Sequence, residues 1–222
     1  MLARRYDPEI MDDFSITDER VDRALAELKI INAYLGGAAT TRKGLRMVQN
    51  AGRNGSPLSI LDAGAGGADV FQRDGNVITV LDKNPRSCAY LRQHTKFTVV
   101  CADAMRLPFK EKSFDVVHVS LFLHHFTESD IVSLLTAFHR IAKQYIVIND
   151  LRRSRAAFLG IRLLTKLFSK STMVQHDGPL SVLRGFSKDD LTVILRRTGF
   201  DNFILKRTWA FHWLVIIPID HK

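Results

Sequence analysis

Residues 59–69 read SILDAGAGGAD, and this stretch governs how the rest of the chain is interpreted. Apolar residues run into the acid Asp62, and glycine or alanine then follows at every position up to Ala68. The pattern predicts a short buried strand that turns sharply into a helix. A turn almost without side chains lets a ligand approach its backbone, and Gly64 or Gly66 can take a positive φ at little cost. The N-terminus of the expected helix would favour an anion or a carboxylate there.

Three other interpretations of this glycine-rich turn fit the sequence less well. A dinucleotide fingerprint, G-x-G-x-x-G counted from Gly64, requires glycine at position 69, which is Asp69. A phosphate-binding loop requires Lys and then Ser or Thr after the last glycine, where Ala68 and Asp69 stand. A merely flexible loop fits poorly with the buried-strand pattern directly before it.

The segment from Leu61 to Ala68 resembles motif I of the class I S-adenosylmethionine (SAM)-dependent methyltransferases, L-D-x-G-x-G-x-G, with Ala68 in place of the third glycine. Within that family the chain looks like the small-molecule enzymes of the methyltransferase type 11 and ubiquinone/menaquinone methyltransferase kinds. The resemblance implies an α/β, Rossmann-like sheet of seven strands. That sheet is mostly parallel with an antiparallel last strand, is flanked by helices and carries an N-terminal helical cap.

Length and composition are those of one soluble globular domain. The 222 residues are 46% hydrophobic and 25% charged, which is ordinary for a globular protein with a full core. No stretch approaches 18 consecutive apolar residues, and the start MLARRYDPEIMDD has acids where a signal peptide needs an apolar run. We therefore expect a cytoplasmic protein. Cys88 and Cys101 lack metal-ligand spacing and are expected to be buried free thiols.

The expected organisation is a single domain, residues 1–222, with four parts. These are a helical cap (1–52), a SAM-binding core (57–150), a basic amphipathic insert on the substrate side (151–185), and a last helix with a terminal β-hairpin (186–222). Periodicity and turn signals predict helices over 18–34, 40–50 and 129–142, strands over 77–81, 97–101, 114–120 and 145–149, and hairpin strands over 200–206 and 209–217.

Acids follow the ends of the predicted second and third strands. Asp82 lies 20 residues after Asp62, the distance at which nucleotide-binding α/β folds place a carboxylate on ribose hydroxyls. Its alternative role is to cap the helix that opens at Asn84. Asp103, followed by Ala104, would contact adenine by resemblance to the family, and its alternative is a turn-forming Asp. Because parallel strands present their C-terminal ends at one edge, these acids should share a site.

The resemblance implies that SAM binds at this edge and leaves as S-adenosylhomocysteine (SAH), with no metal. The residues expected to hold the cofactor are Asp62, Ala63, Gly64, Gly66, Asp82, Lys83, Asp103, Ala104 and Ser120.

The fourth strand runs into LFLHHF, where a methyltransferase places the group that faces the transferred methyl. A [DN]-P-P-[YF] motif, typical of base- and Gln-modifying enzymes, does not occur there. His124 or His125 could accept a proton from an acidic substrate, and Asp150 after the fifth strand is a further candidate. Packed, hydrogen-bonded histidines are the alternative, and His118 within the strand is expected to be core.

The segment 151–207 contains twelve Lys or Arg against four Asp, a net charge of +8 out of +9 for the chain. It begins with a predicted basic amphipathic helix, whose apolar side could be a lid for an apolar substrate, contact an anionic membrane or acidic carrier protein, or border an RNA groove. A solvated face over ordinary core is the alternative. We expect Phe158, Leu164 and His176 on the substrate side, with His176 in a loop, HDGPLSV, that resembles one in polyketide and quinone methyltransferases.

The function hypothesis is SAM-dependent methyl transfer to oxygen or carbon of a small, largely apolar acceptor of phenolic, quinone or polyketide-like kind. In-line displacement needs alignment and exclusion of water more than a strong catalytic group. The alternatives are an RNA methyltransferase, favoured by the basic charge but lacking target-base motifs, and, less favoured, an NAD-linked oxidoreductase or a non-catalytic nucleotide-binding module. Partners other than the acceptor could be an acidic carrier protein or an anionic membrane surface.

Overall fold

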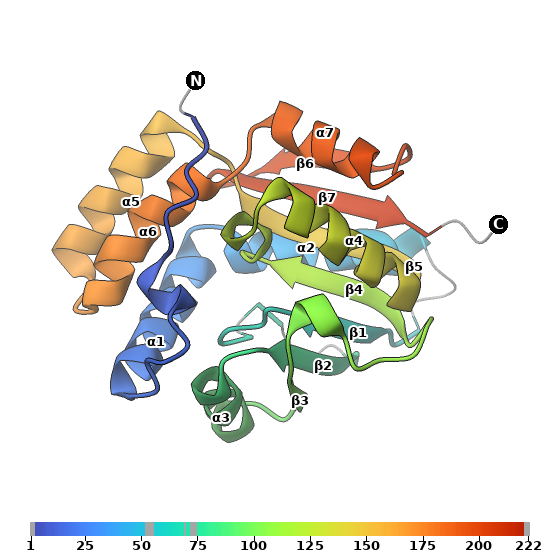
Figure 1. The fold of residues 1–222 in the computed structure, drawn as a ribbon, viewed down its shortest axis with the longest axis horizontal. Helices are drawn as coiled ribbons and strands as arrows, with labels where there is room; N and C mark the ends of the chain where they lie inside the picture. Colours follow the sequence, from blue (N-terminus) through green and yellow to red (C-terminus); the bar gives the residue numbers. More distant parts are fainter. Residues whose placement is uncertain (1–2, 52–55, 69, 72–74, 220–222) are drawn as a thin grey trace.

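The computed structural model describes residues 3–51, 56–68, 70–71 and 75–219, and it contains one seven-stranded sheet (Figure 1). The strand order is β3-β2-β1-β4-β5-β7-β6. The strands are β1 (Ser59–Ala63), β2 (Val77–Asp82), β3 (Thr98–Cys101), β4 (Phe114–Ser120), β5 (Ala142–Leu151), β6 (Ile204–Thr208) and β7 (His212–Pro218).

All neighbouring strands from β3 to β5 are parallel, and β7 is antiparallel to both β5 and β6. The predicted seven-stranded, mostly parallel sheet with an antiparallel last strand is therefore confirmed. The predicted hairpin exists, but its strands begin later than expected. Ala210 and Phe211 take left-handed φ values of 55° and 65°, so the chain is still turning there and β7 begins only at His212.

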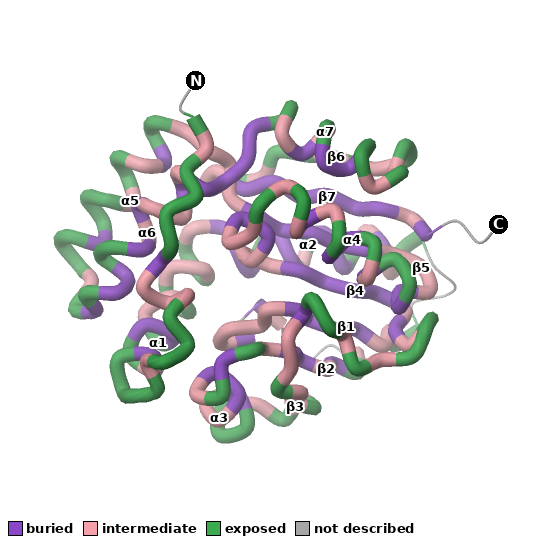
Figure 2. The backbone as a smooth tube through the Cα atoms, viewed as in Figure 1, coloured by how far each residue is buried: buried purple, intermediate pink, exposed green. Residues whose placement is uncertain are grey.

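Helices cover both faces of the sheet. On one face lie α4 (Glu128–Ile141) and α7 (Lys188–Arg197), which pack over β4, β5 and β7 in the larger core cluster. The other face is covered by α2 (Gly37–Ala51) and α3 (Pro85–His94), whose buried leucines pack onto β1, β2 and β7. Figure 2 shows that the central strands are buried along most of their length.

A third group of helices stands at the C-terminal ends of the parallel strands. It comprises α1 (Glu19–Tyr34), α5 (Arg155–Phe168) and α6 (Thr172–Arg184), together with the N-terminal arm and its short 3-10 helix η1 (Ile10–Asp12) (Figure 1). A small core of its own joins α1 to α6 through Val21, Leu25, Met173 and Val174. These elements cover the sheet edge at which the strand-end acids were expected.

Helix boundaries follow local sequence chemistry. Asp18 caps α1 by accepting from the backbone N–H of Arg20. Asn84 caps α3, with Pro85 at the first helical position. A capping box formed by Ser187 and Asp190 opens α7.

Three local predictions were wrong. Among the described residues between β1 and β2 there is no helix, because the stretch is short and Gly64, Gly66 and Ala68 are left-handed. Residues 176–182 belong to α6 and not to a loop, with Pro179 accommodated inside the helix. Cys101 is exposed while Cys88 is buried, since β3 is an edge strand of the sheet.

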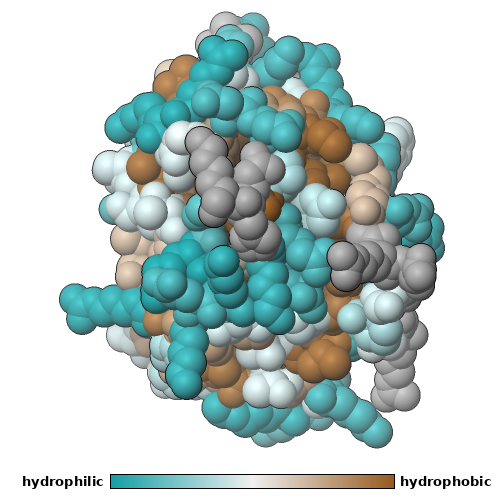
Figure 3. Space-filling model, turned by 90° about the vertical axis from the view of Figure 1, so that its right-hand side faces the viewer, coloured by the Kyte–Doolittle hydropathy of each residue, from teal (hydrophilic) through white to brown (hydrophobic). Residues whose placement is uncertain are grey.

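The surface differs between the two ends of the sheet. The outer side of α5 exposes Leu159, Leu163, Leu167 and Phe168, with 61–76% of each residue accessible. Figure 3 views the opposite end of the molecule, where hydrophilic side chains predominate and hydrophobic ones are scattered. In the described part of the chain, no helix is both long enough and apolar enough to span a bilayer.

Candidate active site

A cavity of about 770 Å³ lies between the C-terminal ends of the strands and the third group of helices. One end, here called the glycine-turn end, is lined by Asp62, the glycines 64, 66 and 67, Asp82 and Asp103. The other, here called the helical end, is lined by apolar residues of α1, α5 and α6, such as Leu28, Ile31, Ile161, Leu164 and Val182. His124 and His125 lie on the wall as well, beside Glu9 and Asp12 of the N-terminal arm.

The turn after β1 is built by backbone conformations that glycine adopts easily. Gly64, Gly66 and Ala68 have φ values of 71°, 51° and 47°. A Cβ on Gly64 would stand 2.1 Å from the Phe122 ring, whereas a Cβ on Gly67 would have no atom of the described residues within 4 Å. The N–H groups of residues 64 and 65 donate to the Leu81 carbonyl, so they tie the turn to β2 and are not available to an anion. A ligand can therefore approach the backbone of the turn at Gly67.

Asp82 ends β2 and faces the cavity. Its carboxylate accepts from the backbone N–H of Gly66 at 2.9 Å and of Asn84 at 2.8 Å. These bonds hold the glycine turn to the end of β2 and leave part of the carboxylate's acceptor capacity for a ligand. Burial raises the pKa of Asp82, although the two backbone N–H groups oppose that shift.

Asp103 follows β3 and lies on the same cavity. Its side chain caps the short helix η2 (Ala104–Arg106) by accepting from Met105 N–H at 2.9 Å, and it pairs with Lys83 Nζ at 2.8 Å. The hydrogen bond from Lys83 lowers the pKa of Asp103 below its usual value. The structure thus brings Asp82, Lys83, Asp103 and Ala104 to one wall, as the sequence predicted.

Asp62 is 2% exposed and stands at the base of the glycine turn. Nδ1 of His118 donates to it at 2.6 Å, and the other ring nitrogen of His118 bonds the Thr41 hydroxyl at 3.0 Å. His118 is fully buried, as expected. Ser120 lines the cavity, but Ala63 does not, because its side chain points from β1 into the core between the sheet and α4. Ala63 can therefore contribute only backbone atoms.

The turn after β4 contains a short 3-10 helix, η3 (Leu123–His125), held by carboxylates. Nδ1 of His124 donates to Asp150 at 2.7 Å, and Asp150 also accepts from the N–H groups of Leu123 and Leu151. Asp150 is fully buried behind His124 and is not among the cavity-lining residues. Although burial alone would raise the pKa of Asp150, its contact with His124 lowers it. Asp150 can orient His124 but does not itself face the cavity.

His125 is bonded from the opposite side. Its Nδ1 donates to Asp12 of the N-terminal arm at 2.6 Å, and Asp12 also accepts from the Arg184 guanidinium at 2.8 Å. These two partners outweigh desolvation and lower the pKa of Asp12. Arg184 of α6 is 3% exposed and also donates to the backbone carbonyls of His124 and Asp7.

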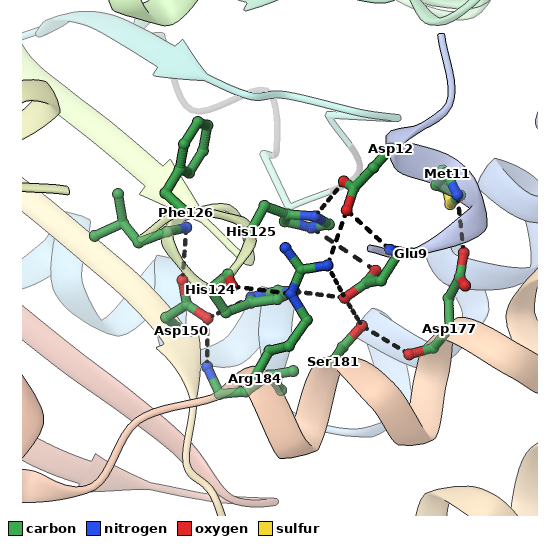
Figure 4. Close-up of polar contacts among 12 residues, drawn as sticks. Glu9, Met11, Asp12, His124, His125, Phe126, Asp150, Asp177, Ser181 and Arg184 are labelled. Carbon is green, nitrogen blue, oxygen red and sulfur yellow. Dashed lines mark hydrogen bonds and ion pairs between the residues drawn. The ribbon is translucent and has the colours of Figure 1, made fainter. Parts of the chain in front are cut away.

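The N-terminal arm is fastened to α6 by further polar contacts (Figure 4). Asp177 accepts from the backbone N–H groups of Ile10 and Met11 at 2.8 and 3.0 Å. Ser181 donates to the Glu9 carboxylate at 2.9 Å, and Glu9 is only 6% exposed. Sequence reasoning missed Glu9, Asp12 and Arg184. The acids of the arm were visible in the sequence, but no local spacing linked them to a histidine pair more than 100 residues away.

Two predicted substrate residues lie outside the cavity. On α5 the lining residues are 156, 157, 160, 161 and 164, which form one helical face that includes Leu164 but not Phe158. On α6 the lining residues are 174, 177, 178, 181 and 182, which leaves His176 on another face. Phe158 and His176 meet instead in a small hollow beside Arg5 and Pro8. The prediction that Phe158 and His176 lie on the substrate side was therefore wrong.

The arrangement as a whole is that of a class I, Rossmann-like methyltransferase fold. Residues 61–146 match the family model described as methyltransferase domain. An uncharacterized methyltransferase of Synechocystis sp. is 32% identical over 91 residues, which are 40% of this chain and 43% of that protein. The matched region thus spans less than half of the relative.

Solved structures share the fold at low sequence identity. The plantazolicin methyltransferase BamL, solved in complex with a triazolic desmethylPZN analog and SAH, has a TM-score of 0.69 at 13% identity, and the match covers 90% of both chains. Human N-acetylserotonin methyltransferase with SAM has a TM-score of 0.62 at 17% identity, covering 97% of this chain and 62% of its own. Magnesium protoporphyrin IX methyltransferase from Synechocystis has a TM-score of 0.57 at 14% identity, covering 84% of each chain. The match to the family model thus lies within residues 61–146, while the whole chain shares the fold of class I SAM-dependent methyltransferases.

Proposed function

We propose that the protein transfers the methyl group of SAM to oxygen or to an acidic carbon of a small, largely apolar acceptor. The observation that carries the proposal is the sharing of one cavity by the glycine turn, Asp82 and Asp103 on one side and an apolar helical wall on the other. SAM supplies an electrophilic methyl group on a sulfonium. The protein has to align the two molecules and exclude water.

The glycine-turn end fits the polar parts of the cofactor. Asp82, whose carboxylate retains acceptor capacity, would bind the two ribose hydroxyls. Asp103 and the backbone of Ala104 would bind the adenine, and Asp62 and Ser120 would lie beside the ammonium group. Gly67 fits close approach by the cofactor because the space beside its Cα is open.

The helical end fits an apolar acceptor with a polar group near the histidine pair. His124 and His125 have their Nδ1 atoms engaged by carboxylates, which leaves Nε2 of each ring available to a substrate proton. His125 is the better candidate, since 22% of its side chain is accessible against 3% for His124. Asp150 and Asp12 would act as positioning residues.

Thermal unfolding with SAH and with NADH tests the cofactor assignment. Saturation at about 100 times Kd adds roughly 2.7 kcal/mol of stability, which for a chain of this size corresponds to a rise of roughly 5–10 °C in Tm. We expect that rise with SAH and none with NADH. Stabilisation by NADH alone would instead support a dinucleotide-linked oxidoreductase or a nucleotide-binding module.

An RNA acceptor is the competing function within the same chemistry, and the net charge of +9 favours it. The apolar lining of the helical end favours a small molecule instead. Affinity for a mixed RNA pool should be negligible even at low salt. Tight binding that falls steeply as salt is raised would support the RNA alternative.

The outer face of α5 suggests how an apolar acceptor arrives. Its exposed leucines 159, 163 and 167 recur every four residues, beside Arg162 and Lys166. Apolar side chains flanked by cations suit an anionic membrane surface. We expect sedimentation with vesicles that contain an anionic lipid and little with neutral vesicles. If the protein sediments with neither kind of vesicle and instead binds an acidic carrier protein, the carrier-protein alternative is favoured over the membrane surface.

A further inference from the structure

The two histidines of η3 are oriented through the same ring nitrogen. Nδ1 of His124 donates to Asp150 at 2.7 Å, and Nδ1 of His125 donates to Asp12 at 2.6 Å. A neutral imidazole bonded in this way carries its lone pair on Nε2. Carboxylates bonded to Nδ1 are the usual outer partners of histidines that ligate metals through Nε2.

Both Nε2 atoms lie beside one buried carboxylate. Nε2 of His124 is 3.6 Å from Oε1 of Glu9, and Nε2 of His125 is 3.9 Å from Oε2 of Glu9 (Figure 4). Both separations exceed the range of an N–H···O hydrogen bond. In a tetrahedral site with metal–ligand bonds of about 2.0–2.2 Å, neighbouring ligand atoms are roughly 3.4 Å apart. One ligand atom from each of the three residues lies within 4.8 Å of the others.

The surrounding charges favour a cation at this point. Among the described residues around the turn, carboxylates outnumber guanidinium groups: Glu9, Asp12, Asp150 and Asp177 stand against Arg4 and Arg184. A dication between Nε2 of both rings and Glu9 would offset that excess of negative charge.

From this geometry we propose that Glu9, His124 and His125 bind one divalent transition-metal ion in the wall of the cavity. Two imidazoles with one carboxylate suit Zn²⁺ or Fe²⁺, and three protein ligands leave a coordination position open. All three residues line the cavity, so that position is accessible to an acceptor. The proposal departs from the sequence-based expectation of no metal. The sequence could not indicate the site, because Glu9 is too far from His124 and His125 to form a ligand motif with them.

The role of the ion in catalysis rests on the proposed function, whereas its binding does not. With both Nε2 atoms bound to the ion, His124 and His125 would be ligands and would not act as the base suggested above. A Lewis acid at this point would hold an acceptor hydroxyl and favour loss of its proton to water. The acceptor oxygen then forms its bond to the methyl carbon as the carbon–sulfur bond breaks, and the electron pair stays on sulfur. The acceptor class narrows to molecules with an ionisable hydroxyl group.

Titration of the metal-free full chain with Zn²⁺ by calorimetry, and with Co²⁺ by visible absorption, tests the site. We expect one equivalent of Zn²⁺ to bind, with Glu9→Gln and His125→Asn each weakening it at least about 100-fold. Asp12→Asn, which weakens the outer partner of His125 and leaves all three ligands in place, should cost roughly 10–100-fold. The matched controls Glu111→Gln and His139→Gln alter exposed residues away from the cavity and should leave binding unchanged.

Absence of stoichiometric Zn²⁺ binding overturns the site. So does binding that Glu9→Gln and His125→Asn leave unaltered, since that is an ion held by other histidines. Should Glu9→Gln fail to fold, the partly exposed His125→Asn decides the matter. SAH binding by each variant is measured in parallel. If the protein binds SAH but not Zn²⁺, the metal site is overturned and the proposed function stands. If it binds Zn²⁺ but not SAH, the proposed function is overturned and the metal site stands.

Discussion

At the glycine-turn end of the cavity, polar side chains stand at the ends of neighbouring strands, and the sheet itself brings them together. At the helical end, the polar side chains come from η1, η3 and α6, and they meet only because the N-terminal arm crosses to α6. The first end depends on strand register and on glycine conformation. The second depends on buried ionic contacts between segments far apart in the sequence. The two ends should therefore respond differently to substitution.

The largest effect is expected from Arg184→Met. Arg184 is 3% exposed and joins Asp12, the Asp7 carbonyl and the His124 carbonyl, so its loss leaves Asp12 half-buried with one partner fewer. Breaking a buried ion pair from one side typically costs about 3–5 kcal/mol. The free energy of unfolding, measured in urea, should fall by that amount. Arg196→Met, on an exposed position of α7, is the control and should change it by less than about 0.5 kcal/mol.

A similarly large change is expected from pH, through His212 at the start of β7. Burial lowers the pKa of His212 from 6.5 to about 4, with Asp150 opposing the shift and His124 adding to it. Between pH 6.5 and 4 the unfolded chain binds a proton that the folded protein does not, so stability falls as pH falls through this window. The contribution is up to roughly 3 kcal/mol.

Urea unfolding at pH 7 and at pH 4.5 measures this loss. His212→Gln should show a smaller loss between the two pH values than the parent, whereas His139→Gln, at an exposed position on α4, should show the same loss. An identical pH dependence in parent and His212→Gln would mean that other groups account for the loss.

At the glycine-turn end, Asp82→Asn should weaken cofactor binding and leave the fold of the helical end unchanged. An amide cannot accept on both of its terminal atoms, so one of the bonds from Gly66, Asn84 or the ribose is lost and the charge disappears. Hydrogen bonds to charged groups contribute about 1.5–3 kcal/mol, which corresponds to a loss of roughly 10- to 100-fold in SAH affinity. Calorimetric titration measures it, with Asp201→Asn as an exposed control.

These predictions reflect what the sequence could and could not indicate. Asp82 and Asp103 were found because a strand that ends in an acid is a local pattern, and parallel strands bring such ends together. Ala63 was assigned to the cofactor site from its place in the motif, yet strand alternation directs its side chain into the core. The helix expected after the turn is absent from the described residues there because left-handed positions cannot continue a helix.

The helical end was much less predictable. The histidine pair was visible, but its partners Glu9, Asp12 and Arg184 depend on how the N-terminal arm docks, which no local periodicity encodes. The basic amphipathic helix predicts Phe158 on the substrate side, and the resemblance of the HDGPLSV segment implies the same for His176. The rotation of α5 and α6 about their own axes decides instead which face lines the cavity, and a shift of two residues along a helix changes that face.

The smallest effect on stability, and a sharp test of the outer face of α5, is expected from Leu163→Ser. Leu163 is 61% exposed, so its removal should change the free energy of unfolding by less than about 0.5 kcal/mol. If this face enters an anionic membrane surface, burying a leucine there contributes about 1.5–3 kcal/mol, and vesicle affinity should fall roughly 10- to 100-fold.

Val193→Ser is the matched control, since Val193 is 52% exposed on α7 and away from this face. Equal loss of vesicle binding in both variants would show that binding does not depend on α5. Loss confined to Leu163→Ser would place the membrane contact beside the cavity, since the adjoining face of the same helix, through Ile161 and Leu164, forms part of the cavity wall.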